Sequence, residues 1–147
     1  MNYYKLLFAI PFIIFGLVLI FMGSLWIFSS EPWMLDKFAN EQRLNMKFEK
    51  LFEAEINLSL PGYLKQIYRF FGLWVFSLGI FILGFTKLIF NGNNNLNLTL
   101  LVCNGILIYF GMIMAYYLIP SSPFIYLGWL SIMLHTISLF IYINYIK

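Results

Sequence analysis

Only a few polar side chains that could carry chemistry lie inside the long apolar stretches of this sequence. His135 is the most informative, because an ionisable group near the middle of an apolar helix could bind haem, a metal or a quinone, or relay a proton. The sequence contains one histidine, so a metal site would need ligands from another chain, and a proton relay would lack a carboxylate partner within the apolar stretches. We therefore favour a neutral His135 that hydrogen-bonds a hydroxyl or carbonyl of a neighbouring helix. It is retained as a candidate cofactor-binding residue.

Three further polar residues lie inside the apolar stretches or at their edges. Asn104 is expected to join helices through its amide group. Cys103 has no cation nearby in sequence to stabilise a thiolate, which does not support a reactive nucleophile. As the single cysteine, it also excludes an intramolecular disulfide. Arg69 could hold an anionic lipid headgroup, but an arginine at the entrance to an apolar helix is expected to anchor that helix.

The motifs that identify common enzymes are missing from the sequence. It has no Walker loop, dinucleotide-binding glycine pattern, histidine pair, nucleophile elbow or aspartate-rich metal motif. The acids Glu49, Glu53 and Glu55 lie among cations and are typical of a solvated helix face. Catalysis by this chain alone is therefore not expected, and no catalytic residue, metal ligand or cofactor is assigned.

The composition indicates a membrane environment for the elements that position these residues. Hydrophobic residues make up 62% of the 147 residues, and charged residues only 10%. Soluble domains, by contrast, have about 25% charged residues. The net charge of +3 comes without a basic stripe, which does not indicate nucleic-acid binding. We expect an all-α, polytopic integral membrane protein with a single membrane domain and a four-transmembrane-helix bundle.

Four apolar stretches are long enough to cross the hydrocarbon core, which takes about 20 helical residues. The first carries no charged residue and is too long for the apolar region of a signal peptide. The reversal at 120–123 is short, so the last two helices are expected to be antiparallel neighbours, with both chain termini on one side. The predicted spans are 6–28, 67–89, 98–119 and 124–146.

One hydrated insertion, residues 29–65, separates the first two spans and holds all six acids of the chain. We expect an amphipathic interfacial helix within it, which could lie on the membrane, cover the ends of the spans or bind a partner. The pair Pro61-Gly62 is expected to end the insertion with a turn. The apolar residues of the expected amphipathic face are Leu44, Phe48, Leu51 and Phe52.

Orientation follows from the positive-inside rule, which counts Lys and Arg and largely ignores acids. The rule places the insertion in the cytoplasm and both termini outside, in the cell membrane or, for a prokaryote, the inner membrane. Tyrosines near both termini and Trp and Tyr residues near the insertion would form the two aromatic belts. The cations of the insertion and of the start of the second span are Lys37, Arg43, Lys47, Lys50, Lys65 and Arg69, against Lys5, Lys87 and Lys147 on the terminal side.

Glycines recur seven residues apart in the first two spans, as Gly16 and Gly23 and as Gly72 and Gly79. This spacing keeps the small residues on one face of a left-handed helix pair, where two backbones can approach closely. We expect these glycine faces to form close-packed helix contacts.

Two short motifs give the chain a resemblance to a known family. The run EPWML at 31–35 follows the first span, and the run RFFG at 69–72 opens the second. At these motifs, over roughly the first 85 residues, the chain resembles the DoxX-like small four-helix membrane proteins. The resemblance implies a helical bundle, and no catalytic residue is carried over from it. The long polar insertion departs from the family pattern, and the last two spans carry no feature diagnostic of the family.

These features favour a non-catalytic accessory, assembly or scaffold subunit of a larger integral membrane complex. Its partners would be the lipid bilayer and other integral membrane subunits, or further copies of the chain. The first alternative is a binder or carrier of a hydrophobic small molecule such as a quinone, sterol or lipid, which would use aromatic helix faces and His135. The second is a small oligomeric transporter or channel. It is the least supported function, because the predicted spans contain no acidic residue.

Overall fold

The computed structural model describes residues 3–147, and within that range the chain is all-helical, without a strand. Four helices are long and apolar enough to cross a membrane, in agreement with the number predicted from the sequence. These are α1 (Tyr3–Phe28), α4 (Leu60–Lys87), α5 (Asn94–Leu118) and α6 (Phe124–Ile141). The shorter elements are η1 (Pro32–Asp36), α2 (Lys37–Leu44), α3 (Phe48–Glu53), η2 (Glu55–Asn57), η3 (Leu88–Asn91) and a π-helical turn, η4 (Tyr142–Ile146).

The second long helix begins earlier than the apolar pattern suggests. Residues 60–65, assigned to the insertion, form the first turns of α4, and Pro61 lies at the helix start. Proline fits there because the first N–H groups of a helix have no intrahelical acceptor. The prediction of a turn at Pro61-Gly62 is therefore wrong, and these two residues extend α4 beyond its apolar stretch.

α1 and α4 are antiparallel and form the most extensive helix pair of the molecule. A Cβ atom on Gly23 would lie 2.7 Å from the carbonyl oxygen of Gly72. One on Gly79 would lie 2.6 Å from the carbonyl oxygen of Gly16. Any side chain at these positions would force the backbones apart, so the glycines allow the close approach. The close-packed glycine faces predicted from the spacing are confirmed, and the two faces pack against each other.

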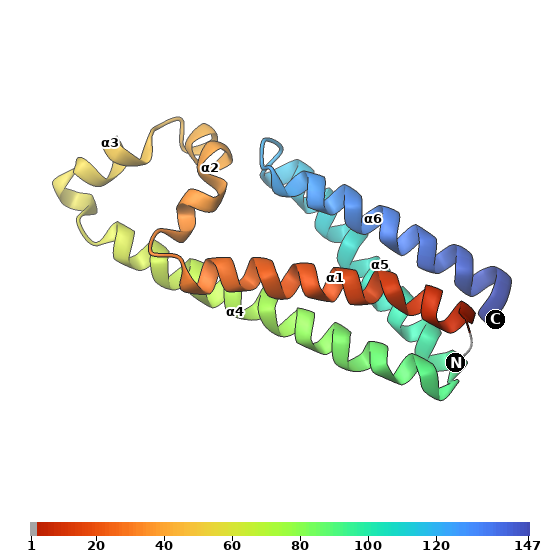
Figure 1. Ribbon diagram of the computed structural model, residues 1–147. Helices are drawn as coiled ribbons and strands as arrows, with labels where there is room; N and C mark the ends of the chain where they lie inside the picture. The colour runs from red at the N-terminus through yellow and green to blue at the C-terminus, as the bar shows by residue number, and fades with distance from the viewer. Residues whose placement is uncertain (1–2) are drawn as a thin grey trace.

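α5 and α6 form an antiparallel hairpin with a short turn. The side chain of Asn93 accepts a hydrogen bond of 3.2 Å from the N–H of Leu96 and caps the start of α5. In the turn, the N–H of Ser122 donates to the carbonyl oxygen of Ile119 at 2.9 Å. At the other end of the molecule, the rings of Tyr4 and Tyr145 stack with their centroids 4.2 Å apart. Both ends of the described chain therefore lie on the same side, as predicted (Figure 1).

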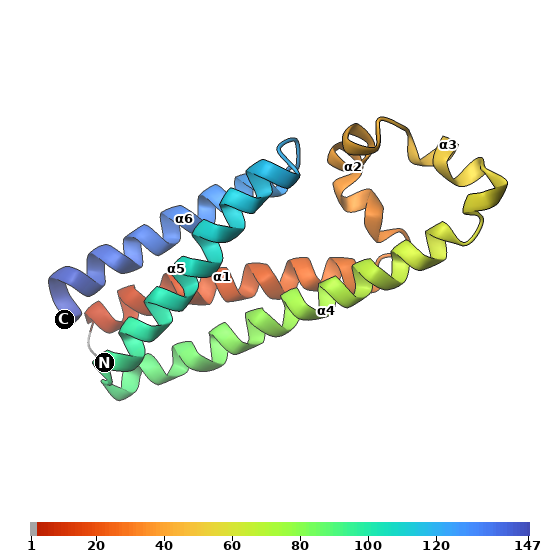
Figure 2. The same ribbon diagram turned by 180° about the vertical axis from the view of Figure 1, so that it is seen from behind.

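The two hairpins are joined through α1, as Figures 1 and 2 show from opposite sides. α1 lies against both α4 and α6, and α5 packs on α6. α5 leaves α4 at the loop after η3, and the two helices then diverge (Figure 2), with sparse contact along their length. The bundle is therefore open between α4 and α5. Its buried core consists of Phe8, Ala9, Phe12, Phe15, Ile82, Ile89, Leu100, Leu101, Ile108, Ile141 and Tyr142.

The amphipathic helix expected to carry Leu44, Phe48, Leu51 and Phe52 on one face is interrupted, and these residues lie on two short helices, α2 and α3. Asn45 takes a left-handed conformation (φ 50°) and ends α2, and α3 begins at Phe48. Asparagine tolerates this conformation because its short polar side chain can hydrogen-bond locally. Leu44 therefore lies on a different helix from Phe48, Leu51 and Phe52. It is 48% exposed, whereas Phe48 is 4% exposed.

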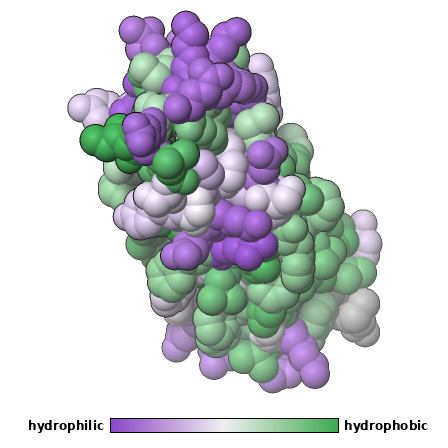
Figure 3. Space-filling view, turned by 90° about the vertical axis from the view of Figure 1, so that its left-hand side faces the viewer, coloured by the Kyte–Doolittle hydropathy of each residue, from purple (hydrophilic) through white to green (hydrophobic). Residues whose placement is uncertain are grey.

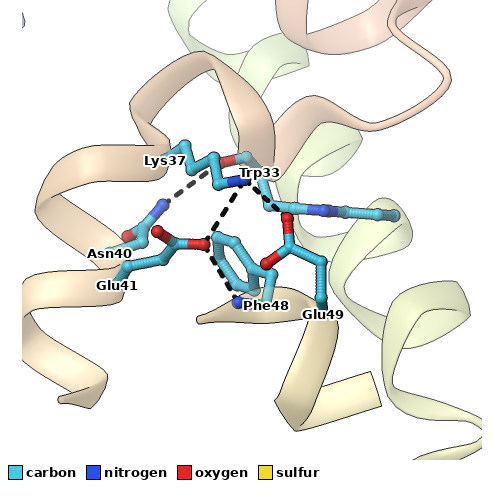
Figure 4. A network of polar contacts seen from close by, with 6 residues as sticks. All are labelled: Trp33, Lys37, Asn40, Glu41, Phe48 and Glu49. Atoms are coloured by element: carbon cyan, nitrogen blue, oxygen red, sulfur yellow. Dashed lines mark hydrogen bonds and ion pairs between the residues drawn. The ribbon is translucent and has the colours of Figure 1, made fainter. Parts of the chain in front are cut away.

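A small polar network holds α2 against α3 (Figure 4). Lys37 Nζ on α2 donates to Glu49 Oε1 on α3 at 2.7 Å and lies 3.6 Å from Glu41 Oε1. Glu41 Oε1 also accepts a hydrogen bond of 3.0 Å from the N–H of Phe48, which satisfies a donor at the start of α3. The hydrogen bond between Lys37 and Glu49 raises the pKa of the lysine and lowers the pKa of the carboxyl.

Hydrophilic and hydrophobic residues occupy different parts of the surface. Figure 3 views the end that carries the insertion: hydrophilic residues gather in its upper part, with a further patch at mid-height, and the surface below is mostly hydrophobic except at its lower edge. Phe21, Phe81 and Phe110, on three of the long helices, are each more than 60% exposed. Water-soluble monomers rarely expose large contiguous apolar areas, so this surface suits a lipid environment.

Candidate functional site

His135 lies buried between α5 and α6, and both of its ring nitrogens have partners. Nε2 lies 3.0 Å from the backbone carbonyl oxygen of Leu101, and Nδ1 lies 3.2 Å from the hydroxyl oxygen of Tyr109. A carbonyl oxygen only accepts, so Nε2 carries the proton and donates it; in a neutral ring Nδ1 then accepts from the Tyr109 hydroxyl. The predicted bonds to a carbonyl and a hydroxyl of a neighbouring helix are therefore present.

α5 is shaped locally to receive this ring. Gly105 faces His135, and a Cβ atom there would lie 3.0 Å from Nε2 and 3.1 Å from Cε1. Leu101 and Tyr109 lie about one turn before and after Gly105, so one face of α5 supplies the acceptor, the space and the donor. The arrangement joins the two helices near their middle. A cofactor could bind a ring nitrogen only by displacing one of these partners.

A small cavity lies beside His135, where α1, α5 and α6 meet. It leaves about 10 Å³ for the centres of water-sized molecules, and one water needs about 10–15 Å³ by this measure. Its hydroxyls already bond to helix carbonyls: Ser131 Oγ to Leu127 O at 2.8 Å, and Ser138 Oγ to Phe8 O at 3.3 Å. The cavity is too small for an organic cofactor. Its lining is Pro11, Phe12, Phe15, Asn104, Ile108, Ser131, Leu134, His135 and Ser138.

Asn104 bonds within its own helix instead of forming the interhelical bond expected from the sequence. Its Nδ2 donates to the carbonyl oxygen of Leu100 at 2.9 Å, while its buried Oδ1 has no partner within residues 3–147. Asn97, seven residues earlier on α5, is fully buried, and both of its amide atoms also lack partners in that range. In an apolar interior, unpaired polar atoms of this kind destabilise the fold.

The open side between α4 and α5 forms a cleft of about 300 Å³. Cys103 lines the cleft and is exposed. Asn104 lines it as well, so this amide stands between the inner cavity and the cleft. The cleft can therefore accept apolar side chains or a lipid chain. The rest of its lining is Leu78, Phe81, Ile82, Phe85, Leu100 and Leu107.

The other residues singled out from the sequence lie at the insertion end of the molecule. Arg69 is exposed on α4 and forms no ion pair with a carboxylate of residues 3–147. Phe48 stacks on Phe52 with ring centroids 5.4 Å apart, and Phe52 meets Trp33 edge-on at 5.6 Å. These rings form the interior of the insertion, and among the expected apolar face only Leu44 is exposed.

The joint between the insertion and the α5–α6 turn has no counterpart in the sequence pattern. Arg43 on α2 donates through Nη1 to the carbonyl oxygen of Leu118 at the end of α5, across 75 residues of chain. Asp36, at the end of η1, is 7% exposed. Burial raises the pKa of the Asp36 carboxyl, and a hydrogen bond with Ser122 in the turn lowers it in part. A cation and an acid within a charged insertion give no spacing signal that could reveal such distant partners.

No group of three His, Cys, Asp or Glu side chains within residues 3–147 could hold a metal ion. Comparison with known proteins finds no matching family model, no matching curated protein and no matching solved structure. The resemblance to the DoxX-like proteins stays a prediction.

Proposed function

We propose that the protein is a multi-pass membrane protein that serves as a non-catalytic accessory, assembly or scaffold subunit of a larger integral membrane complex. The observation that carries this proposal is the open cleft between α4 and α5. Contacts form between α1 and α4, between α1 and α6, and between α5 and α6. The remaining contact of a closed four-helix ring, α4 with α5, is replaced by the cleft. A membrane helix of another subunit would close the ring.

The chemistry of the cleft suits a protein helix better than lipid. Membrane helices associate by close packing and by hydrogen bonds between helices. Cys103 is small and exposed between the bulkier side chains of the cleft, which leaves room for a larger partner side chain. Asn104 lies about 15 Å along α5 from its first residue, near the middle of a hydrocarbon core of about 30 Å. A partner helix can donate a hydrogen bond to the buried Oδ1 of Asn104 once this side chain turns toward the cleft, whereas lipid chains offer no donor at that depth.

In this proposal the insertion faces the cytoplasm and both termini lie outside, in the cell membrane or, for a prokaryote, the inner membrane. The insertion end carries more Lys and Arg residues than the terminal side, and positive charge is retained on the cytoplasmic side. α2 and α3 would then form a cytoplasmic cap next to the α5–α6 turn, to which Arg43 already connects.

Photo-crosslinking in native membranes tests the cleft directly. A benzophenone side chain in place of Cys103 would face the cleft. The same side chain in place of Ile106, which is 66% exposed and lies outside the cleft lining, is the matched control. We expect position 103 to crosslink to a membrane protein of defined mass, which mass spectrometry would identify, and position 106 to react with lipid. Crosslinks to lipid alone at both positions would contradict the proposal.

The alternative functions named from the sequence stay predictions. A quinone, sterol or lipid bound at His135 would have to displace the Tyr109 hydroxyl or the Leu101 carbonyl, because both ring nitrogens already have partners. Loss of an enriched small molecule on His135→Ala would support that function. A transporter or channel would need several copies of the chain around a shared pore.

A further inference from the structure

A groove of about 530 Å³ runs along α5 on the outer surface of the α5–α6 hairpin. Its α5 residues recur at helical spacing from Tyr109 to Tyr116 and therefore form one face over two turns, a length of about 10 Å. Ile132 contributes from α6. The groove is apolar along most of its length. Its lining is Tyr109, Met112, Ile113, Tyr116, Tyr117 and Ile132.

A cation lies next to the end of this groove. Arg43 donates through Nη1 to the carbonyl oxygen of Leu118, the residue directly after Tyr117 of the groove. A guanidinium group has five N–H donors, so this contact leaves most of them for another acceptor. Arg43 is exposed and pairs with no carboxylate in the described part of the chain. The acid two residues before it, Glu41, is bound to Lys37.

Tyr116 adds a hydrogen-bond donor at the same end. Its hydroxyl oxygen accepts a bond of 3.0 Å from Trp129 Nε1. An indole N–H only donates, so the proton of the Tyr116 hydroxyl is available to an acceptor outside the protein. Tyr116 is 48% exposed and lies two residues before the end of α5. Membrane proteins place tyrosine and tryptophan at this depth, close to the lipid headgroups.

We propose that this groove binds one phospholipid of the surrounding leaflet. The phosphate lies against Arg43, because a guanidinium group binds phosphate through paired, charge-assisted hydrogen bonds. The Tyr116 hydroxyl donates to an ester carbonyl, and one acyl chain follows the apolar lining toward Tyr109. The order of cation, donor and apolar groove along the helix matches the order of phosphate, ester and chain in a phospholipid. The site depends on the proposed membrane insertion, but not on a partner subunit.

A purely structural role for Arg43 leads to a different expectation. A cation at the C-terminal end of a helix stabilises it by binding the last carbonyl groups, and this requires no lipid. Such a role depends on the arginine alone. Phospholipid binding depends also on the free space over Ile113, which is 65% exposed in the groove. Variants at the two ends of the site therefore separate the two roles.

The test is native mass spectrometry of the full chain released from a mild detergent, with lipid extraction from the same sample. We expect the unmodified protein to retain one phospholipid. Arg43→Gln should lower the retained fraction at least about tenfold, as for the loss of a hydrogen bond to a charged group. Arg43→Lys keeps the charge but not the paired hydrogen bonds, and should restore part of the binding. Ile113→Trp fills the groove, leaves Arg43 in place and should also lower retention.

Two matched variants control for charge and bulk. Lys50→Gln removes another exposed cation of the insertion, and Ile106→Trp adds the same bulk to α5 outside the groove; both should retain phospholipid like the unmodified protein. Equal retention by Arg43→Gln and Lys50→Gln, or by Ile113→Trp and Ile106→Trp, overturns the proposal. So does an unmodified protein that carries no phospholipid. None of these results affects the crosslinks expected at position 103, so the two proposals fail independently.

Discussion

His135 fills the space that a side chain on Gly105 would need, because a Cβ atom there would lie 3.0 Å from Nε2. Gly105→Val should push the imidazole away from the Leu101 carbonyl and loosen α5 from α6. We expect a loss of about 1–3 kcal/mol in the free energy of unfolding, the usual cost of overpacking. Gly111→Val on the same helix, where a Cβ would meet nothing within 4 Å, should have a much smaller effect. Unfolding in detergent measures both variants, and equal losses would contradict the prediction.

The contact between α1 and α4 should be the most sensitive to a single methyl group. A Cβ atom on Gly23 would lie 2.5 Å from the backbone nitrogen of Phe76, and a backbone atom cannot move aside as a side chain can. Gly23→Ala should therefore destabilise the protein by about 3 kcal/mol, at the upper end of overpacking costs. Gly84→Ala, in open space on α4, should instead gain up to about 1 kcal/mol of helix propensity. Thermal unfolding of the two variants in one detergent gives the comparison; a stabilised Gly23→Ala would refute the close approach.

Stability should depend on pH through Asp36. Burial raises the pKa of this carboxyl above its ordinary value of 3.8, so the folded chain holds the proton more tightly than the unfolded chain. The contribution of Asp36 to stability should fall as the pH rises from 3.8 to the folded-state pKa and stay level above it. Asp36→Asn stays neutral and should remove this fall and raise the unfolding temperature at neutral pH. Glu53→Gln, which changes an exposed acid on α3, is the control. If Asp36→Asn leaves the dependence of the unfolding temperature on pH unchanged, Asp36 is not its cause.

Asn104→Leu should have opposite effects on the isolated protein and on the proposed complex. Leucine removes a buried amide oxygen without a partner, a feature that costs about 1–3 kcal/mol, so the isolated protein should unfold at a higher temperature. Recovery of the partner in a pulldown should fall, since Asn104 lines the cleft. Asn97→Leu is the control, because this buried asparagine lies outside the cleft lining. Asn97→Leu should raise stability and leave partner recovery unchanged. Equal partner recovery from both variants would show that Asn104 does not contribute to the interface.

The long helices and the glycine contact could be predicted because they depend on local patterns. An uncharged apolar stretch that is as long as a membrane is thick predicts a helix, whatever its neighbours are. A spacing of seven residues places Gly16 and Gly23 on one face of the helix in any left-handed pair. The prediction of one amphipathic helix was wrong because of a single residue, Asn45. The apolar periodicity continues from Leu44 to Phe48 across Asn45, and nothing in the hydrophobic pattern marks the left-handed residue that ends α2.

The candidate site could be predicted only as a kind of environment. An imidazole in an apolar interior needs hydrogen-bond partners, so a carbonyl or hydroxyl next to His135 could be expected. The identity of those partners, Leu101 and Tyr109, depends on how α6 is rotated against α5, which tertiary packing decides. The contact of Arg43 with Leu118 depends on the path of the insertion over the hairpin, which no periodicity in the sequence encodes.

The division into two hairpins also bears on how the chain is made. α1 has its α4 partner by residue 87, before any of α5 or α6 has been synthesised, and these two helices then pair with each other. Each hairpin can therefore assemble as it leaves the ribosome, and the contact between α1 and α6 joins the two hairpins afterwards. If the gene is divided at the codon for Gly92, which lies in the exposed loop between α4 and α5, we expect the two expressed fragments to reassemble in one bilayer. The covalent connection through this loop would then mainly ensure that the two halves are made in equal amounts.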